Sequence, residues 1–166
     1  RSIEAYSGLA FRQLKIDEYI QENWNYIQEK VFILSAFYGI TCGTCKIKKH
    51  RLDFSIKLFE DVSLYKFWSE YVNSSFSENE TIINLASSEY SKLIDKKRVD
   101  FINIDFYENK ELKQISANSK KARGEMLNLL IKNQIENIKV IKTLKLKEYS
   151  YNRELASNNN LVFIKD

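Results

Sequence analysis

The sequence is poor in several residue types: it has no proline, four glycines, two cysteines and one histidine among 166 residues. Two cysteines are too few for the disulfide framework of a small secreted domain and fit a reducing compartment, so we expect a cytoplasmic protein. No apolar run approaches the roughly 18 residues of a membrane-spanning helix, and no signal peptide is visible, so no membrane partner is expected. Neither a glycine-rich phosphate loop nor a histidine-based nucleophile–base pair can be recognised. We therefore expect no catalytic residue and no cofactor.

The residues that are present describe one folded domain. Hydrophobic residues make up 44% of the chain and aromatic residues 13%, which excludes a disordered or low-complexity chain. A chain of 166 residues is long enough to bury a core, and no repeat or linker interrupts it. We expect a single compact domain over residues 1–166.

Positive charge is concentrated in two places although the net charge is only +4. Residues 1–80 are close to neutral, whereas residues 112–147 hold nine basic and two acidic side chains. A second concentration, called here the basic loop, covers residues 46–51 (Lys46-Ile47-Lys48-Lys49-His50-Arg51). Concentrated positive charge favours an anionic partner.

The spacing of apolar residues predicts both helices and strands. The expected helices are two short ones within 4–29, one over 62–76, one over 87–94 and a long one with Ser119 as its N-cap. The expected strands are 31–34, 54–58, 81–86, 148–151 and 161–164, together with a hairpin of 100–107 and 111–116 about residues 108–110. This mixed order predicts an α+β domain: a mixed sheet with flanking helices.

The pair Cys42 and Cys45, with His50 five residues on, could bind a metal or undergo redox chemistry. A closed zinc site needs four ligands, and the chain has no other cysteine or histidine to complete one. We favour an incidental loop composition and predict no metal site.

Three cations, Lys120, Lys121 and Arg123, are expected to open the long helix, where the helix dipole prefers negative charge. An anionic ligand at this helix end would explain them. A solvated run of charge, or an internally paired arginine, explains them equally well.

Polar residues follow the strand expected at 81–86. Asn84, Ser87 and Glu89 could reach a ligand, because open sheets place ligands at the carboxyl ends of their strands. Capping of the following helix is the simpler interpretation, and we favour it.

Seven motifs resemble, in order and at compatible spacing, those of the YaaA family of bacterial peroxide-stress proteins. They are Ala5-Tyr6-Ser7-Gly8-Leu9, Leu34-Ser35-Ala36-Phe37-Tyr38-Gly39, Arg51-Leu52-Asp53, Leu64-Tyr65-Lys66-Phe67-Trp68, Ile83-Asn84-Leu85-Ala86-Ser87-Ser88-Glu89-Tyr90, Lys120-Lys121-Ala122-Arg123-Gly124-Glu125-Met126 and Leu161-Val162-Phe163. The family's N-terminal third, which opens with an S-P-A-K motif, is absent, so we expect an N-terminally truncated member.

The resemblance implies a cytoplasmic protein of the peroxide response that limits free intracellular iron and protects DNA from hydroxyl radicals. It also implies a mixed α and β fold that binds double-stranded DNA through a basic cleft, with a helix-hairpin-helix element. In the family's hairpin pattern Ala36 replaces a glycine, which argues against a left-handed backbone there. Cys42 and Cys45 stand where relatives have Arg and Asp, so the family's chemistry cannot depend on these thiols.

These observations together predict a non-enzymatic DNA-binding protein of the peroxide-stress response, a monomer with no inferred protein partner. The residues expected to contact DNA phosphates are Lys46, Lys48, Lys49, Arg51, Lys120, Lys121 and Arg123. Those expected to line the cleft are Tyr38, Asn84, Ser87 and Glu89.

Two other functions stay open. An enzyme, or a binder of a small phosphorylated ligand, would gather Asn84, Ser87, Glu89, Lys120 and Arg123 around one pocket. Direct iron handling is less favoured, because the shortage of histidine and cysteine leaves only carboxylates as ligands.

Overall fold

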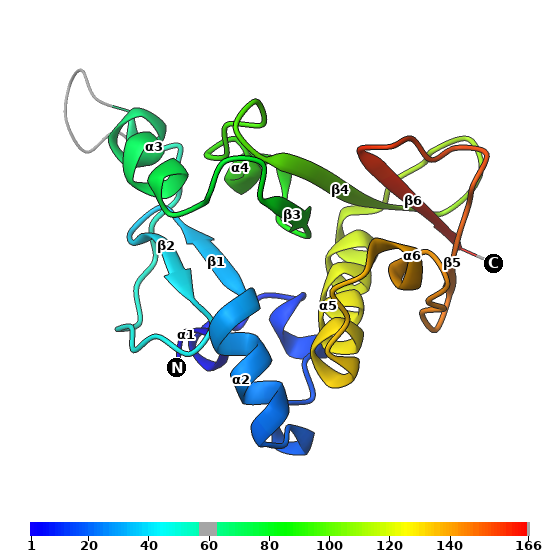
Figure 1. The fold of residues 1–166 in the computed structure, drawn as a ribbon, viewed down its shortest axis with the longest axis horizontal. Coiled ribbons are helices and arrows are strands. Elements are labelled where there is room, and N and C mark those ends of the chain that lie inside the picture. The colour runs from blue at the N-terminus through cyan, green and yellow to red at the C-terminus, as the bar shows by residue number, and fades with distance from the viewer. Residues whose placement is uncertain (57–62, 166) are drawn as a thin grey trace.

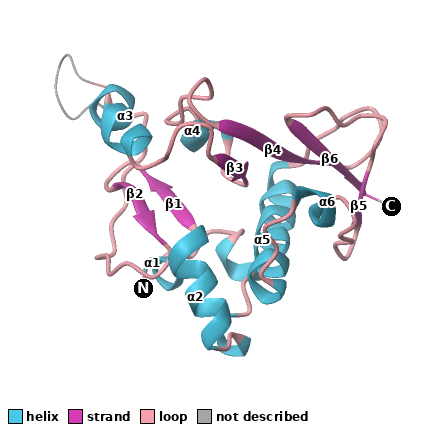
Figure 2. Ribbon diagram, viewed as in Figure 1, coloured by secondary structure: helices cyan, strands magenta, loops and turns pink. Residues whose placement is uncertain are grey.

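A four-stranded sheet and a long helix organise the structure, a computed structural model that describes residues 1–56 and 63–165 (Figures 1 and 2). The strands are β1 (Phe32–Ser35), β2 (Gly39–Cys42), β3 (Thr81–Asn84), β4 (Asp100–Tyr107), β5 (Tyr149–Tyr151) and β6 (Asn160–Lys165). The helices are α1 (Ser2–Ala5), α2 (Gln21–Lys30), α3 (Leu64–Ser74), α4 (Ser88–Ser91), α5 (Ser116–Asn133) and α6 (Ile138–Ile141), with the short 3-10 helices η1 (Phe11–Gln13) and η2 (Ile16–Glu18).

The sheet has the strand order β3-β4-β6-β5. β4 pairs in parallel with β3 on one side and with β6 on the other, and β5 runs antiparallel to β6 at the edge. The parallel register sets Asn84 opposite Asn103 and Asn103 opposite Asn160. A mixed sheet with flanking helices confirms the predicted α+β class.

Helix α5 lies beneath β4 and β6 in the view of Figure 1 and forms the main core with them. Ala122, Met126 and Leu130 of α5 are buried in one cluster with Ile104 and Phe106 of β4. Those helix residues recur every four positions, so one stripe of α5 packs on the sheet and the remaining faces can serve other purposes.

Two buried amides attach α5 to the N-terminal segment. The Asn128 side-chain oxygen accepts hydrogen bonds from the Lys15 backbone N–H at 3.0 Å and from the Tyr19 hydroxyl at 2.9 Å. Asn23 of α2 donates to the carbonyl of Ile131 at 2.8 Å. Buried polar groups need such partners, and these fix where the N-terminal segment lies.

The β1–β2 hairpin is separate from the sheet and packs against α3. The Trp68 indole N–H donates to the carbonyl of Ala36 at 2.8 Å, and a Cβ on Gly39 would lie 2.6 Å from the Trp68 ring. Gly39 has a φ of +71°, so the left-handed position of this turn is Gly39. Ala36 is therefore compatible with the turn. The family's hairpin pattern forms a β-hairpin here, and the helix-hairpin-helix element stays a prediction.

Most predicted strands are confirmed. The runs at 31–34, 81–86, 148–151 and 161–164 correspond to β1, β3, β5 and β6, and 100–107 is β4. The predicted helices at 62–76 and 87–94 are α3 and the shorter α4. Two short helices were predicted within 4–29. There α1 ends at Ala5, two 3-10 turns follow, and α2 is the one α-helix longer than a single turn.

The predicted hairpin of 100–107 with 111–116 is wrong. Both neighbours of β4 are parallel strands: β3, the strand before it in the chain, and β6, near the C-terminal end. After β4 the chain turns instead, with the Glu108 N–H bonded to the Lys113 carbonyl at 2.8 Å and Leu112 at a φ of +60°. It then enters α5 at Ser116, and no strand forms over 111–116.

Two further predictions need correction. Ser119 is not the N-cap of the long helix, because α5 begins at Ser116 and the buried Ser119 hydroxyl donates to the Phe106 carbonyl at 3.2 Å. In the predicted strand 54–58, residues 54 and 55 form a turn, closed by a hydrogen bond from the Ile56 N–H to the Asp53 carbonyl at 3.1 Å. Phe54 is buried there, stacked on Tyr65; residues 57 and 58 lie outside the described part of the chain.

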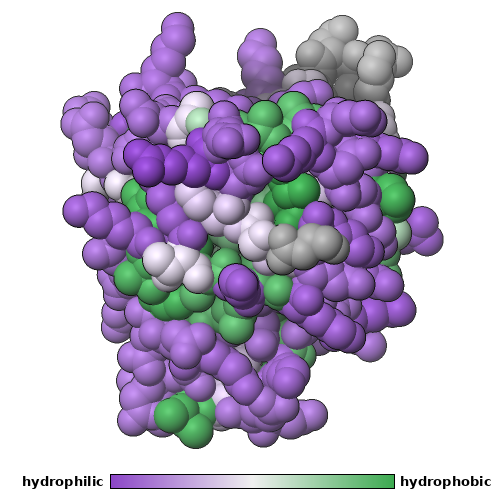
Figure 3. Space-filling view, turned by 90° about the vertical axis from the view of Figure 1, so that its right-hand side faces the viewer, coloured by the Kyte–Doolittle hydropathy of each residue, from purple (hydrophilic) through white to green (hydrophobic). Residues whose placement is uncertain are grey.

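The surface turned toward the viewer in Figure 3 is dominated by hydrophilic side chains, with apolar surface in scattered patches. Over residues 1–56 and 63–165, every helix is too short or too polar to cross a membrane.

Candidate functional site

A polar pocket of about 650 Å³ lies beside the parallel strands, with a row of three asparagines along it. We call Asn84, Asn103 and Asn160 the asparagine ladder. The Asn84 amide donates to the Asn103 side-chain oxygen at 2.7 Å, and the Asn103 amide donates to the Asn160 oxygen at 3.1 Å. Each hydrogen bond orients the next amide, so the ladder ends on the N–H₂ group of Asn160. Within the described residues that group has no partner and is free to donate.

Helices α4 and α5 complete the pocket. Ser87, Ser88 and Ser91 line it from α4 and the residue before it, and Lys120 and Arg123 line it from α5. Ser87 occupies the N-cap position of α4, yet its side chain makes no capping hydrogen bond. Ser87 was expected to cap this helix with its side chain, and that expectation is wrong. The Ser87 hydroxyl stays available to a ligand.

Arg123 is the most unusual group in the pocket. Its Nε is buried, with no hydrogen-bond partner in the part of the chain that the structure describes. Burial lowers the pKa of Arg123 from its ordinary value, while the nearby Asp105 and Tyr107 act in the opposite direction. Burying a cation without a hydrogen-bonded partner of opposite charge costs free energy. An anionic group bound in the pocket would reduce that cost.

The structure brings together four of the five residues expected to share a pocket. Asn84, Ser87, Lys120 and Arg123 line the cavity, whereas Glu89 is not among its lining residues. The Glu89 backbone carbonyl accepts a hydrogen bond from the Tyr65 hydroxyl at 3.0 Å. Because α5 begins at Ser116, Lys120 and Arg123 lie one to two turns inside the helix and not at its end.

The basic loop is held beside the β1–β2 hairpin by His50 and Tyr38. The His50 ring stacks on Phe37 with centroids 4.9 Å apart, and its Nε2 lies 3.2 Å from the Ser35 hydroxyl. The Tyr38 hydroxyl accepts from the Lys48 backbone N–H at 3.1 Å. Tyr38 therefore supports the loop and does not line the pocket.

Four cations of the basic loop point to solvent. Lys46, Lys48, Lys49 and Arg51 are all exposed, and none forms an ion pair within residues 1–56 and 63–165. Lys120 and Lys121 are also exposed, and neither forms an ion pair with a residue that the structure describes. By contrast, Lys132, from the basic stretch 112–147, pairs with Glu18.

The N-terminal segment 6–11 connects the basic loop to α5. Tyr6 stacks on Phe11 at 5.2 Å between centroids and meets the His50 ring edge-on at 5.9 Å. At the other end of the segment, the Ala10 carbonyl lies against Gly124. The segment thus contacts both the basic loop, at His50, and α5, at Gly124.

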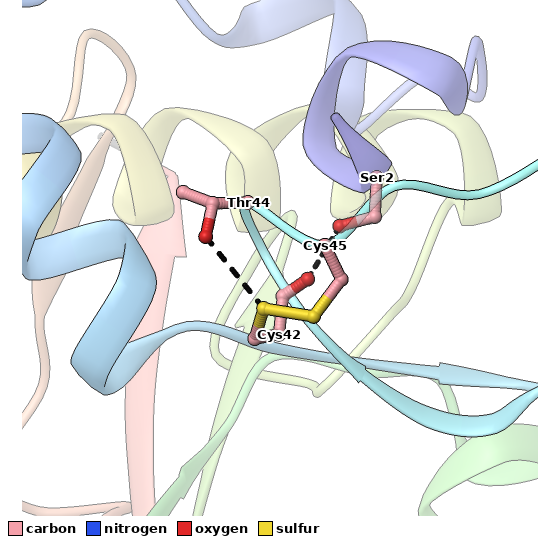
Figure 4. Close-up of a disulfide and its surroundings, with 4 residues drawn as sticks. All are labelled: Ser2, Cys42, Thr44 and Cys45. Carbon is pink, nitrogen blue, oxygen red and sulfur yellow. Dashed lines mark hydrogen bonds between the residues drawn. A yellow bond between two sulfur atoms is a disulfide. The ribbon is translucent and has the colours of Figure 1, made fainter.

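Cys42 and Cys45 are joined by a disulfide (Figure 4). The carbonyls around it hold α1, since the Ser2 hydroxyl donates to Cys42 at 2.5 Å and the Ser2 N–H to Cys45 at 2.7 Å. The pair is thus a structural link here, which the sequence analysis did not predict. Among the described residues, no group of three or more histidine, cysteine, aspartate or glutamate side chains is placed to hold a metal ion.

Sequence reasoning missed Asn103, Asp105 and Asn160. Asn103 and Asp105 alternate with buried apolar residues along β4, a pattern that predicts a second, polar face of the strand. That pattern alone does not show which residue stands beside Asn103, because the partner Asn160 lies 57 residues away.

Together the fold and the pocket define an α+β protein whose candidate site is polar and cationic. The sequence model described as peroxide stress protein YaaA matches residues 1–155. A UPF0246 protein of Fusobacterium nucleatum is 39% identical over 168 residues, covering 98% of this chain and 67% of the relative. One of Streptococcus sanguinis is 36% identical over 165 residues, covering 97% and 68%. The chain belongs to the YaaA family of peroxide stress proteins, which confirms the resemblance of its motifs.

Proposed function

We propose that the protein binds double-stranded DNA through its exposed cations as part of the cytoplasmic response to peroxide. The observation that carries the proposal is the set of solvent-facing cations without carboxylate partners among the described residues. They are Lys46, Lys48, Lys49, Arg51, Lys120 and Lys121.

Unpaired lysines and arginines are suited to phosphates because each contact releases a counterion from DNA and costs no internal ion pair. Contacts of this kind position a protein on DNA without reading its sequence. The proposal is one of binding by a monomer, without catalysis.

The peroxide part of the proposal is supported by membership of the peroxide-stress family. Limiting free iron is carried over from the same resemblance. Together they give one physiological role: less free iron forms fewer hydroxyl radicals, and DNA is the target that is spared.

The test is the affinity for a fluorescent DNA duplex over a series of salt concentrations. If about six phosphates are neutralised, log affinity should fall with log salt at a slope of roughly −5. The double variant Lys48→Ala/Lys49→Ala should bind more weakly and reduce the slope by about 2, because two phosphate contacts are lost. Cells carrying this variant should also hold more free iron under peroxide, measured by electron paramagnetic resonance.

The matched control is Lys30→Ala/Lys165→Ala, which removes the same charge from lysines that already pair with Glu136 and Glu148. It should leave the slope close to that of the wild type. Binding that is independent of salt, or an equal loss in both double variants, would contradict the proposal.

A further inference from the structure

We propose that the asparagine-ladder pocket binds the phosphate monoester of one nucleotide, either at a 5′-phosphorylated DNA end or as a free nucleoside monophosphate. The choice of a DNA end rests on the proposed DNA binding, whereas the free nucleotide does not. The pocket itself is assigned from its own geometry.

Hydrogen-bond donors dominate the pocket. The Ser87 hydroxyl caps nothing, the ladder ends on the free N–H₂ of Asn160, and the Lys120 ammonium has no ion-pair partner within the described chain. These donors come from three segments far apart in the sequence and line one cavity. A phosphate monoester matches them because it presents three terminal oxygens and close to two negative charges.

Arg123 is the second, independent observation. Its Nε is buried and unpartnered, and burial lowers its pKa, so the fold keeps a cation in a place that disfavours charge. An oxyanion beside the guanidinium would replace the lost water with charge-assisted hydrogen bonds.

Asp105 indicates what the phosphate is attached to. This carboxylate lines the same pocket, and its only hydrogen bond in the described structure is a long one from the Tyr107 hydroxyl, at 3.4 Å. A carboxylate repels phosphate but accepts hydrogen bonds from hydroxyl and N–H groups. The organic part of the ligand should therefore carry such donors, as the sugar and base of a nucleotide do.

The size of the pocket fits one nucleotide and excludes a duplex. About 650 Å³ lies within the range of roughly 300–1,000 Å³ for small-molecule sites. An internal phosphodiester of duplex DNA would stay outside and meet only the exposed lysines. A terminal nucleotide can enter, so the pocket should distinguish DNA ends from continuous DNA.

The experiment compares two neighbouring lysines of α5. Both lysines are exposed on the same helix, but Lys120 lines the pocket and Lys121 does not. DNA hairpins of one sequence, with one blunt end carrying either a 5′-phosphate or a 5′-hydroxyl, are titrated into the wild type, Lys120→Gln and Lys121→Gln. Wild type should prefer the phosphorylated hairpin by about tenfold, the effect of one hydrogen bond to a charged group. Lys121→Gln should weaken the binding of both hairpins equally, because it removes one proposed backbone contact, and should keep this preference. Lys120→Gln should lose most of this preference.

A second measurement uses the wild-type protein alone. Adenosine monophosphate and adenosine are each titrated and followed by the shift in thermal unfolding, with inorganic phosphate as a further probe. The monophosphate should stabilise the protein at lower concentration than adenosine, and it should weaken binding of the phosphorylated hairpin more than binding of the hydroxyl hairpin.

The outcomes separate the two proposals. If both hairpins bind equally well and the monophosphate has no effect, the pocket proposal is overturned while the DNA proposal stands. If neither hairpin binds but the monophosphate stabilises the protein, the pocket holds a free nucleotide and the DNA proposal fails. Equal loss of preference in Lys120→Gln and Lys121→Gln would also overturn the pocket proposal, since it would place the end recognition on the helix surface.

Discussion

At the scale of single residues, two tyrosines that join the N-terminal segment to α5 and to the residues just after it are pH-sensitive groups. The Tyr19 hydroxyl donates to Asn128 at 2.9 Å, and burial raises the pKa of Tyr19 from 10.0 to about 12. The Tyr26 hydroxyl donates to the Ile135 carbonyl, and burial raises its pKa to about 12 as well. The fold therefore accommodates the protonated phenols and disfavours the phenolates.

We expect the free energy of unfolding to fall as the pH rises from about 10 to 12. In that pH window, tyrosines of the unfolded chain lose their protons while Tyr19 and Tyr26 in the folded chain keep theirs. Deprotonation therefore stabilises the unfolded state relative to the folded state. Below pH 10 both states are protonated and the contribution is fully present. Urea unfolding at pH 9, 10 and 11 measures the decline.

The variants Tyr19→Phe and Tyr26→Phe should each make this decline less steep, and Tyr71→Phe, at an exposed position of α3, should not change it. A decline that is as steep in the double variant Tyr19→Phe/Tyr26→Phe as in the wild type would show that these tyrosines are not its cause.

At the scale of elements, α5 uses different faces for different neighbours. One stripe packs on the sheet, Arg123 and Lys120 face the pocket, and Gly124 meets the N-terminal segment. A Cβ on Gly124 would lie 2.0 Å from the Ala10 carbonyl oxygen, so this glycine allows two backbones to touch. Glycine in a helix is unfavourable by roughly 0.5–1 kcal/mol relative to alanine, and here close packing explains its presence.

Gly124→Ala should destabilise the protein by about 1–3 kcal/mol, because the overpacked backbone must move and the gain in helix propensity is smaller than that strain. The measurement is the urea midpoint at constant slope. Gly8→Ala is the matched control, since a Cβ there would have its nearest neighbour, the Phe11 ring, at 4.0 Å. A Gly124→Ala variant as stable as the wild type would contradict the close approach of the two backbones.

Elements could be predicted where local sequence decides them. The apolar runs of β3 and β6 and the three- and four-residue spacing in α3 indicated their type directly. The hairpin after β4 was predicted wrongly because partner choice in a parallel sheet is not local: β6 follows β4 by about fifty residues. Two of the three ladder residues were missed for the same reason, since Asn103 and Asn160 become neighbours only through that pairing.

At the scale of the whole molecule, the charge along the sequence and the charge in space differ. The stretch 112–147 is strongly basic in sequence, but Lys132 pairs with Glu18, and Arg123 turns into the pocket. The basic loop keeps all four cations in solvent. The charge count along the sequence therefore predicts an anionic partner, whereas the fold decides which of the cations are exposed to solvent.

The asparagine ladder has a consequence for folding itself. Its three amides form a continuous row of hydrogen bonds only when β3, β4 and β6 pair in one register. If one strand slipped by one residue, its asparagine would point to the opposite face of the sheet. The unfolded chain thus holds no fragment of the pocket, and occupancy and folding are thermodynamically linked. A ligand present at a hundred times its dissociation constant would add about 2.7 kcal/mol to the free energy of unfolding of the whole domain. In this protein, ligand supply would also govern how much of the chain is folded.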